Sequence, residues 1–173
     1  DNKLCFNESG AAAPPPADTK AIIPPKKSDC DALPSRVARL APDMMHFAED
    51  PKPVIILDKE GKPLKADDPH RFFEASWCHK YKGKYYFSYS TGDTHMICYA
   101  IGDNPYGPFT YQGVILTPVK SGWTTHHSIV EFKGKWYLFH HDSAPSGGVN
   151  SLRSLKVAEL HYNEDGTIQT IEG

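Results

Sequence analysis

The chain has 173 residues, of which 39% are hydrophobic and 23% charged, and a formal net charge of -2, so we expect one globular domain with a core of its own. A net charge this small gives no electrostatic support for binding nucleic acid or an acidic membrane surface. No apolar run approaches the roughly 20 residues of a membrane-spanning helix, and no signal-peptide pattern opens the sequence.

Residues 1–35 differ in composition from the rest of the chain. They include AAAPPP at 11–16 and PPKK at 24–27, without any hydrophobic periodicity. Such composition has little apolar surface to bury, so it predicts a Pro-rich surface loop or arm. Residues 36–173 would then form the folded domain.

The four cysteines lack the C-x-x-C spacing of a zinc ribbon. Cys5 and Cys30 flank the Pro-rich segment and would pair in an oxidising compartment. Cys78 and Cys98 lie in strand-like segments, and we expect both to be buried thiols. This cysteine usage is compatible with either redox compartment.

From about residue 36 onward, short apolar segments alternate with turn residues. An aromatic content of 12%, together with 13 Gly and 15 Pro, favours strands over helices. The dipeptides Lys82-Gly83, Lys133-Gly134 and Asp165-Gly166 stand between apolar alternations and predict hairpins. The sequence therefore predicts an all-β chain with ten strands: Val37–Leu40, Val54–Leu57, Ala75–Lys80, Tyr85–Tyr89, Met96–Ile101, Thr110–Leu116, His127–Phe132, Trp136–His140, Leu155–His161 and Thr167–Ile171.

The strand pattern also repeats. HKYKGKYYF at 79–87 aligns with VEFKGKWYL at 130–138, an offset of 51 residues, and DMMHFAEDPKPVIIL at 43–57 resembles DNPYGPFTYQGVIL at 103–116. A period near 50 residues with four strands is typical of a β-propeller blade. On this interpretation the ten strands are two outer strands of one blade followed by two complete blades.

Two and a half blades do not close a propeller, which needs at least four. Alone, they would leave a broad apolar face and unpaired strand edges in water. We therefore expect the chain to be the C-terminal part of a larger propeller, with the missing N-terminal half as its partner. Because the repeat is short, a small two-sheet sandwich is the alternative.

One pair of residues is predicted to meet at the propeller axis. The innermost strand of each blade begins at the central channel, and the offset of 51 residues brings Glu74 and Thr125-His126 to nearly equivalent points. Glu74 stands among aromatic residues in FFEASW at 72–77, which disfavours its charged form and suits a general acid. The alternative for Glu74 is an ordinary glutamate at a strand edge.

FEASW at 73–77, YKGKYY at 81–86, HHSIV at 126–130 and GKWY at 134–137, in this order and spacing, resemble glycoside hydrolase family 43. The resemblance covers about residues 36–171 and about half of such a catalytic domain. It implies part of a five-bladed propeller from an inverting exo-glycosidase. The members most similar in these motifs are β-xylosidases, α-L-arabinofuranosidases and exo-arabinanases, which release terminal xylose or arabinose from plant cell-wall oligosaccharides.

The resemblance also implies roles for individual residues. Glu74 matches the general acid that protonates the departing glycosidic oxygen. His126 matches the histidine at the channel centre that in many members binds calcium, directly or through water, whereas strand alternation turns His127 to the opposite face. Arg153 matches the arginine that contacts the substrate sugar and the catalytic carboxylates, although without the family it would read as surface charge.

Two tryptophans and a histidine pair are further candidates. Trp77 and Trp123 are expected to stack on a sugar ring of the oligosaccharide substrate; Trp123 is favoured because it lies in a turn near the channel, and core packing is the alternative for Trp77. His140, His141 and Asp142 are a candidate metal cluster. Because alternation sends the two imidazoles to opposite faces, a structural role is the favoured reading.

The aspartates of the inverting mechanism, a general base and a second one that orients the acid, belong to the first half of the family's propeller. Asp68-Pro69 resembles the base motif, but it lies six residues before Glu74 on an approach loop, so we do not assign Asp68 as the base. We therefore expect this chain alone to be catalytically inactive. A rival from another class is a non-catalytic propeller segment that binds carbohydrate or protein.

Overall fold

The computed structural model describes residues 29–122 and 125–173. Within these residues no helix is long and apolar enough to cross a membrane. They form one short 3-10 helix and ten strands, which confirms the predicted all-β fold class: η1 (Ala144–Ser146), β1 (Ser35–Val37), β2 (Lys52–Val54), β3 (Ile56–Leu57), β4 (Glu74–Tyr81), β5 (Lys84–Ser90), β6 (Ile97–Gly102), β7 (Phe109–Leu116), β8 (Ser128–Phe132), β9 (Lys135–Asp142) and β10 (Ser154–Leu160).

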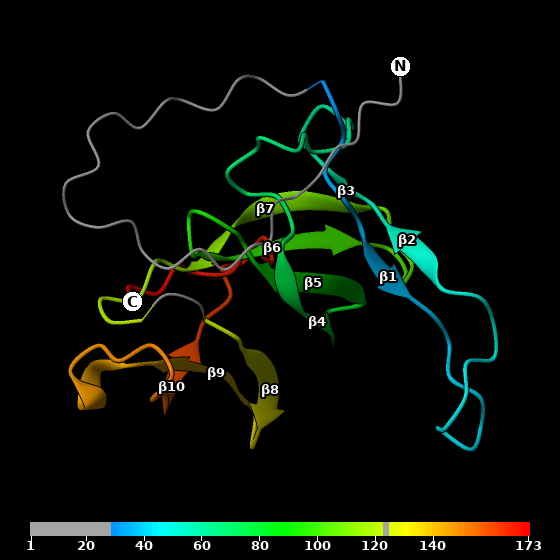
Figure 1. Ribbon diagram of the computed structural model, residues 1–173. Coiled ribbons are helices and arrows are strands. Elements are labelled where there is room, and N and C mark those ends of the chain that lie inside the picture. The colour runs from blue at the N-terminus through cyan, green and yellow to red at the C-terminus, as the bar shows by residue number, and fades with distance from the viewer. Residues whose placement is uncertain (1–28, 123–124) are drawn as a thin grey trace.

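The strands form three sheets. A five-stranded sheet has the order β3-β7-β6-β5-β4, a three-stranded sheet has the order β10-β9-β8, and β1 pairs with β2. In the five-stranded sheet β4 to β7 are successive antiparallel neighbours, and β3 joins parallel to β7. The three-stranded sheet lies below the β4 side of the five-stranded sheet, and β1–β2 lies to one side (Figure 1).

Two predicted hairpins have the expected turns. Lys82 and Gly83 both have positive φ, 44° and 83°, and connect β4 to β5; Lys133 and Gly134, with φ of 51° and 77°, connect β8 to β9. Two successive residues with positive φ form the turn whose twist matches that of paired strands. The repeated Lys-Gly motif therefore encodes the same hairpin in two sheets.

The first two predicted strands differ in their bounds. Val37–Leu40 is replaced by β1, which ends at Val37, and Val54–Leu57 divides into β2 and β3. The division occurs at Ile55, whose carbonyl accepts a hydrogen bond from Phe109 N–H at 2.9 Å. The chain thus leaves β1 at this point and pairs with β7.

The last predicted strand, Thr167–Ile171, is wrong as a regular strand. Ile168 and Ile171 form only isolated bridges, with Tyr162 and with Leu116 of β7. Ile168 is 5% exposed in the core, and Ile171 N–H donates to Ile115 O at 2.8 Å. Because these contacts tie the segment to the five-stranded sheet, it does not add a fourth strand to β8–β10.

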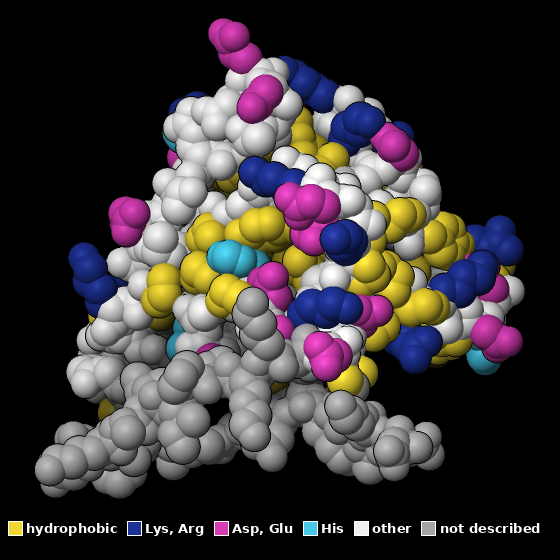
Figure 2. Space-filling view, turned by 90° about the horizontal axis from the view of Figure 1, so that it is seen from above, with side chains coloured by type: hydrophobic (Ala, Val, Ile, Leu, Met, Phe, Trp, Pro, Cys, Tyr) yellow, Lys and Arg dark blue, Asp and Glu magenta, His cyan; other side chains and the backbone are white. Residues whose placement is uncertain are grey.

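The five-stranded sheet separates two hydrophobic cores. The first lies between this sheet and β8–β10 and includes Tyr99, Leu138 and Ile168. The second lies on the opposite face and includes Val54, Phe87, Tyr89, Cys98 and Phe109. On the face seen from above, hydrophobic side chains are visible among charged ones (Figure 2).

The cysteine expectations had mixed outcomes. Cys98 is buried, as expected, but Cys78 is exposed, so that expectation was wrong. Trp77 packs against the first core and strand alternation turns Cys78 to the other face, where Cys78 is exposed because β4 is the edge strand of the sheet. Cys30 is disulfide-bonded, and Cys5 lies outside the described residues.

The predicted boundary near residue 35 remains a prediction, because residues 1–28 lie outside the described part. The end of the predicted arm does contact the fold. Ala32 N–H donates to Leu64 O at 2.8 Å, Ala66 N–H donates to Cys30 O at 2.9 Å, and Lys65 Nζ lies 2.6 Å from Asp31 Oδ1. These contacts hold residues 30–32 against the loop that leads towards β4.

Two histidines lie between the sheets in neutral surroundings. Burial lowers the pKa of His79 to about 4. Burial, with smaller contributions from neighbouring histidines, lowers the pKa of His127 to about 3. Since an unfolded histidine titrates near pH 6.5, the unfolded chain binds more protons than the folded chain between pH 6.5 and about 4.

We therefore expect the free energy of unfolding to fall as the pH is lowered from 7.5 to 5.0, by about 2 kcal/mol for each of these histidines. Urea titrations across this range measure the change. His127→Gln keeps a polar group beside Ser88 but does not titrate, and should remove the contribution of His127, about 2 kcal/mol over this range. A free energy of unfolding independent of pH in this range would contradict the assignment.

Candidate active site

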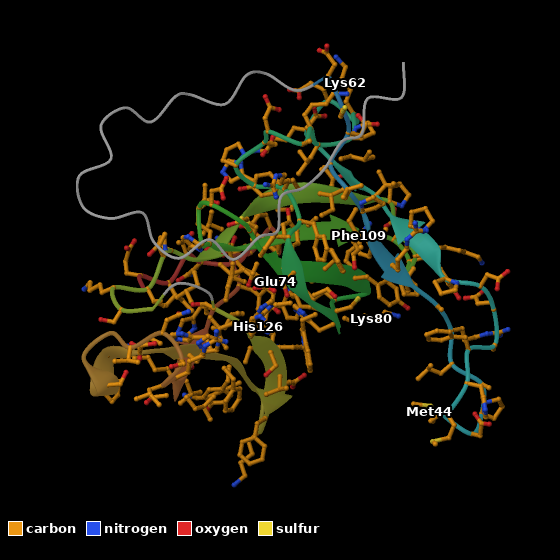
Figure 3. All side chains as sticks on the ribbon, in the orientation of Figure 1. Met44, Lys62, Glu74, Lys80, Phe109 and His126 are labelled. Carbon is orange, nitrogen blue, oxygen red and sulfur yellow. The ribbon has the colours of Figure 1, made fainter. Side chains whose placement is uncertain are left out.

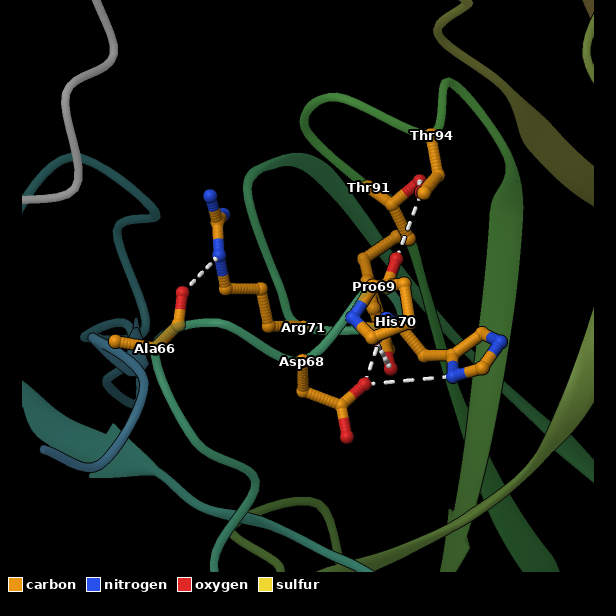
Figure 4. Close-up of polar contacts among 8 residues, drawn as sticks. Ala66, Asp68, Pro69, His70, Arg71, Thr91 and Thr94 are labelled. Atoms are coloured by element: carbon orange, nitrogen blue, oxygen red, sulfur yellow. Dashed lines mark hydrogen bonds and ion pairs between the residues drawn. The ribbon is translucent and has the colours of Figure 1, made fainter. Parts of the chain in front are cut away.

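The loop before β4 is held by its own polar groups. Asp68 Oδ1 accepts a hydrogen bond from His70 N–H at 2.7 Å and lies 3.3 Å from His70 Nδ1. Arg71 Nε donates to Ala66 O, and Thr94 Oγ1 donates to Pro69 O, both at 2.7 Å (Figure 4). The Asp68 carboxylate is therefore engaged within its own loop, which delivers the chain to the first residue of β4.

Glu74 and His126 are brought together from two sheets. Glu74 begins β4, and His126 stands two residues before β8. His126 Nε2 lies 3.3 Å from Glu74 Oε1, and Figure 3 shows the two side chains side by side between the sheets. The Glu74 side chain is 37% exposed, while Phe72 packs in the second core. A histidine and solvent therefore adjoin the carboxylate.

Three hydrogen bonds hold the chain before and within β8 against β4 and β5. Ser90 Oγ donates to Thr125 O. Ser88 Oγ and His127 Nε2 are 2.7 Å apart. Trp77 Nε1 donates to Ile129 O at 3.0 Å. We call these three bonds the polar seam.

The polar seam uses alternate residues, and so confirms the expected alternation. The His127 ring meets Ser88 of the five-stranded sheet and the Ile129 side chain packs in the first core, whereas the His126 side chain is 51% exposed, so the two neighbouring imidazoles point in different directions. Ser88 is fully buried and Ser90 is 4% exposed. Because buried polar groups are costly to leave unpaired, the seam fixes how far β8 stands along β4, and with it the place of His126 beside Glu74.

His141 is a site residue that the sequence reasoning did not select. Its Nε2 accepts a hydrogen bond from His126 N–H at 3.0 Å. A backbone N–H can only donate, so Nε2 carries no proton and the ring is the Nδ1–H tautomer. Burial, the Arg153 guanidinium and His126 lower the pKa of His141, consistent with a neutral ring.

A sequence signal for His141 does exist. The hairpin at Lys133-Gly134 pairs Ser128 with Phe139, and two steps further the same register sets His126 opposite His141. His140, the other member of the pair, is 7% exposed, so the prediction that the two rings face opposite ways is confirmed.

The remaining candidates lie in different surroundings. Arg153 is exposed just before β10, with its Nε donating to Asn150 O at 3.0 Å. Trp77 is partly buried against the first core, and its indole N–H belongs to the polar seam. Trp123 lies outside the described residues. The structure thus brings Glu74, His126, His141 and Arg153 to one edge of the two sheets.

The described residues do not by themselves fit a calcium ion. Calcium takes six to eight oxygen ligands, and beside His126 they offer the carboxylate of Glu74 and a second imidazole. Residues 29–122 and 125–173 contain no group of three or more His, Cys, Asp or Glu placed to hold a metal. We therefore derive no chemical step through calcium.

Comparison with known proteins identifies relatives that cover most of the chain. A sequence profile described as Glycosyl hydrolases family 43 matches residues 35–168. A xylosidase/arabinosidase of Bacteroides ovatus is 72% identical over 154 residues, which are 88% of this chain and 46% of that protein. A β-xylosidase of Xylanibacter ruminicola is 73% identical over 142 residues, 82% of this chain and 44% of that protein. The chain spans about half the length of the curated relatives it matches.

Solved structures give the same result. The RS223 β-xylosidase is 68% identical with a TM-score of 0.82, over 89% of this chain and 47% of that chain. A second structure is a β-xylosidase/α-arabinofuranosidase from a compost microbial metagenome, in complex with xylotriose and in a calcium-free form. It is 61% identical with a TM-score of 0.82, over 84% of this chain and 44% of that chain. The expected fold, part of a five-bladed β-propeller, is thereby confirmed.

The polar seam makes a prediction about stability. Ser88→Ala leaves the buried His127 Nε2 without its partner, and His127 Nδ1 has no hydrogen-bond partner in the described structure. We expect the free energy of unfolding to fall by about 1–3 kcal/mol, measured by urea denaturation at pH 7.5. Ser76→Ala, at an exposed position on β4, is the matched control and should change it by less than about 0.5 kcal/mol. Equal losses of unfolding free energy for Ser88→Ala and Ser76→Ala would contradict the stabilising role of the polar seam.

Proposed function

Because the chain belongs to glycoside hydrolase family 43, we propose that it carries the general-acid side of an inverting exo-glycosidase. The complete protein would release terminal xylose or arabinose from plant cell-wall oligosaccharides. The observation that carries this proposal is the approach of Glu74 to His126, 3.3 Å apart, where two sheets meet. The names of the relatives, xylosidase/arabinosidase and β-xylosidase, support the sugar class.

Glu74 is the proposed general acid. In its protonated form the carboxyl gives its proton to the glycosidic oxygen as the bond from that oxygen to the anomeric carbon breaks. Its partial exposure, 37% of the side chain, leaves it accessible to a substrate. The imidazole of His126 lies beside Oε1, where it orients the carboxyl group and interacts with the carboxylate that remains.

Inversion requires a second carboxylate, roughly 6.5–9.5 Å from the first, to activate the attacking water. The family resemblance assigns neither this base nor the orienting aspartate to any residue here, and Asp68 is engaged in its own loop. We propose that both aspartates come from the rest of the propeller. Glu74, His126 and Arg153 would then be one side of a site completed by residues outside this chain.

We propose that the rest of the propeller packs against the outer face of β8–β10. Phe132, Leu155 and Val157 on this sheet are 60%, 76% and 57% exposed. An apolar face of this kind is costly in water and marks an interface. Since the chain spans about half of its relatives, we propose that a further blade covers this face and brings its carboxylates towards His141 and Arg153.

Substrate contacts are proposed for three residues. The exposed guanidinium of Arg153 offers donors for sugar hydroxyls. Trp123 remains the favoured aromatic platform for a sugar ring, on the sequence argument alone. Trp77 is the weaker candidate, because its indole N–H is already bonded to Ile129 O.

Calcium is proposed as a cofactor of the complete propeller only, at His126, with water and the remainder of the protein supplying most ligands. We expect millimolar Ca²⁺ to leave the unfolding temperature of this chain alone unchanged, because the described residues fit the ion poorly. Differential scanning fluorimetry with Ca²⁺, and with Mg²⁺ as the control, measures this. A rise specific to Ca²⁺ in the isolated chain would contradict the expectation.

The catalytic proposal is tested in a hybrid enzyme, the Bacteroides ovatus relative with its matching 154-residue segment replaced by that of this chain. We expect the hybrid to hydrolyse xylobiose. Glu74→Gln should lower kcat on xylobiose by at least about 100-fold, but by less than about tenfold on a nitrophenyl xyloside, whose leaving group needs little protonation. Steady-state kinetics on both substrates give the ratio.

Asp68→Asn is the matched control, a carboxylate close in sequence that we do not place in the site, and its kcat should stay within about threefold of the hybrid. Equal losses on the two substrates for Glu74→Gln would contradict the acid role. A hybrid that unfolds cooperatively yet hydrolyses neither substrate would instead favour a non-catalytic propeller segment that binds carbohydrate or protein.

A further inference from the structure

Strand β4 is irregular directly beside Glu74. Glu74 pairs with Ser90, and Trp77 pairs with Ser88, with a register shift between them. Three steps along β4 therefore correspond to two steps along β5, so β4 holds one extra residue, a β-bulge. Within the bulge, Ala75 has a φ of 56°.

This backbone conformation sets Ala75 apart. Among the non-glycine residues with positive φ in the described part of the chain, Ala75 is the one inside a strand. The others lie in turns or loops: Met44, Lys82, His95 and Lys133. In the left-handed region the Cβ of an L-residue crowds the backbone, at a cost that glycine does not have and that grows for β-branched residues. Such conformations persist where the surroundings require them.

The extra residue decides where Glu74 points. In a regular strand, residues three apart face opposite sides, so Glu74 and Trp77 would point away from each other. With the bulge, both share the side of their partners Ser88 and Ser90. That side faces the second sheet, because Trp77 donates to Ile129 O and Ser90 donates to Thr125 O.

Without the bulge, Glu74 would face the second core, where Phe72 and Phe87 pack 6.2 Å apart between ring centroids. A carboxylate there would meet apolar side chains in place of His126. The sign of one φ angle therefore determines whether the carboxyl group reaches the site.

We propose that Ala75 is a positioning residue, whose left-handed conformation turns Glu74 towards His126. The expected effect on kcat rests on the proposed function, whereas the effect of Ala75 on the direction of the Glu74 side chain does not. A small residue is required because the bulge tolerates no β-branched side chain, and glycine should serve as well as alanine.

The kinetic test compares three variants of the hybrid enzyme. Ala75→Ile, whose β-branched side chain disfavours the left-handed conformation, should lower kcat on xylobiose by at least about 100-fold, as Glu74→Gln does, with KM changed by less than about threefold and a smaller loss on the nitrophenyl xyloside. Ala75→Val should show the same preference for the activated substrate to a lesser degree. Ala75→Gly, the matched control, should retain kcat within about threefold.

Combination with Glu74→Gln separates positioning from general damage. The double variant, Ala75→Ile with Glu74→Gln, should be no slower than the slower of the two single variants, because both remove the same proton transfer. Losses that multiply, or an Ala75→Ile variant as active as the hybrid, would overturn the proposal.

NMR spectroscopy tests the contact between Glu74 and His126 without any need for catalytic activity. In this chain, Glu74→Gln should shift the NMR resonances of the His126 imidazole, and the same substitution should leave them unchanged in the Ala75→Ile background. In the Ala75→Gly background the shift should persist. A shift that survives Ala75→Ile overturns the positioning role, whereas an inactive hybrid with the expected shifts overturns the proposed function alone.

Discussion

The arrangement of the candidate site depends on the polar seam, in which Ser90, Ser88 and Trp77 bond to Thr125, His127 and Ile129. Hydrophobic packing between two sheets is tolerant of small slides, but a buried hydrogen bond has one acceptable geometry and a cost when it is unmade. The seam therefore sets the relative positions of β4 and β8. Glu74 and His126 meet because Glu74 begins β4 and His126 lies two residues before β8, and the seam holds these two strands in place.

Strand alternation then divides the histidines between two functions. His127 and His140 point into the first core and are held neutral, and burial lowers the pKa of both. His126 and His141 point to the open edge, where one adjoins a carboxylate and the other accepts a backbone hydrogen bond. Neighbouring residues of one type thus stabilise the interface and build the site, because successive side chains of a strand face opposite sides.

The exposed apolar face of β8–β10 lies on the same sheet as part of the candidate site. His141 lies in β9 and Arg153 just before β10, in the same sheet whose outer face exposes Phe132, Leu155 and Val157. In the proposed complete propeller, the blade that covers this face is also the one closest to the open side of Glu74 and His126. Folding and completion of the active site would then be one event, since burial of the apolar face brings the missing carboxylates into range.

The sequence by itself determined the local features of this protein. Alternation and the Lys-Gly turns predicted most of the strands and two hairpins, the motif order indicated the family, and the internal repeat set Glu74 and His126 at equivalent points. These features are local because a turn or a strand periodicity is encoded by adjacent residues. His141 was also within reach, through the hairpin register that sets it opposite His126. The tertiary structure alone decided the bulge at Ala75, the exposure of Cys78 and the pairing of Ile171 with β7, because each depends on which distant surface packs against the strand.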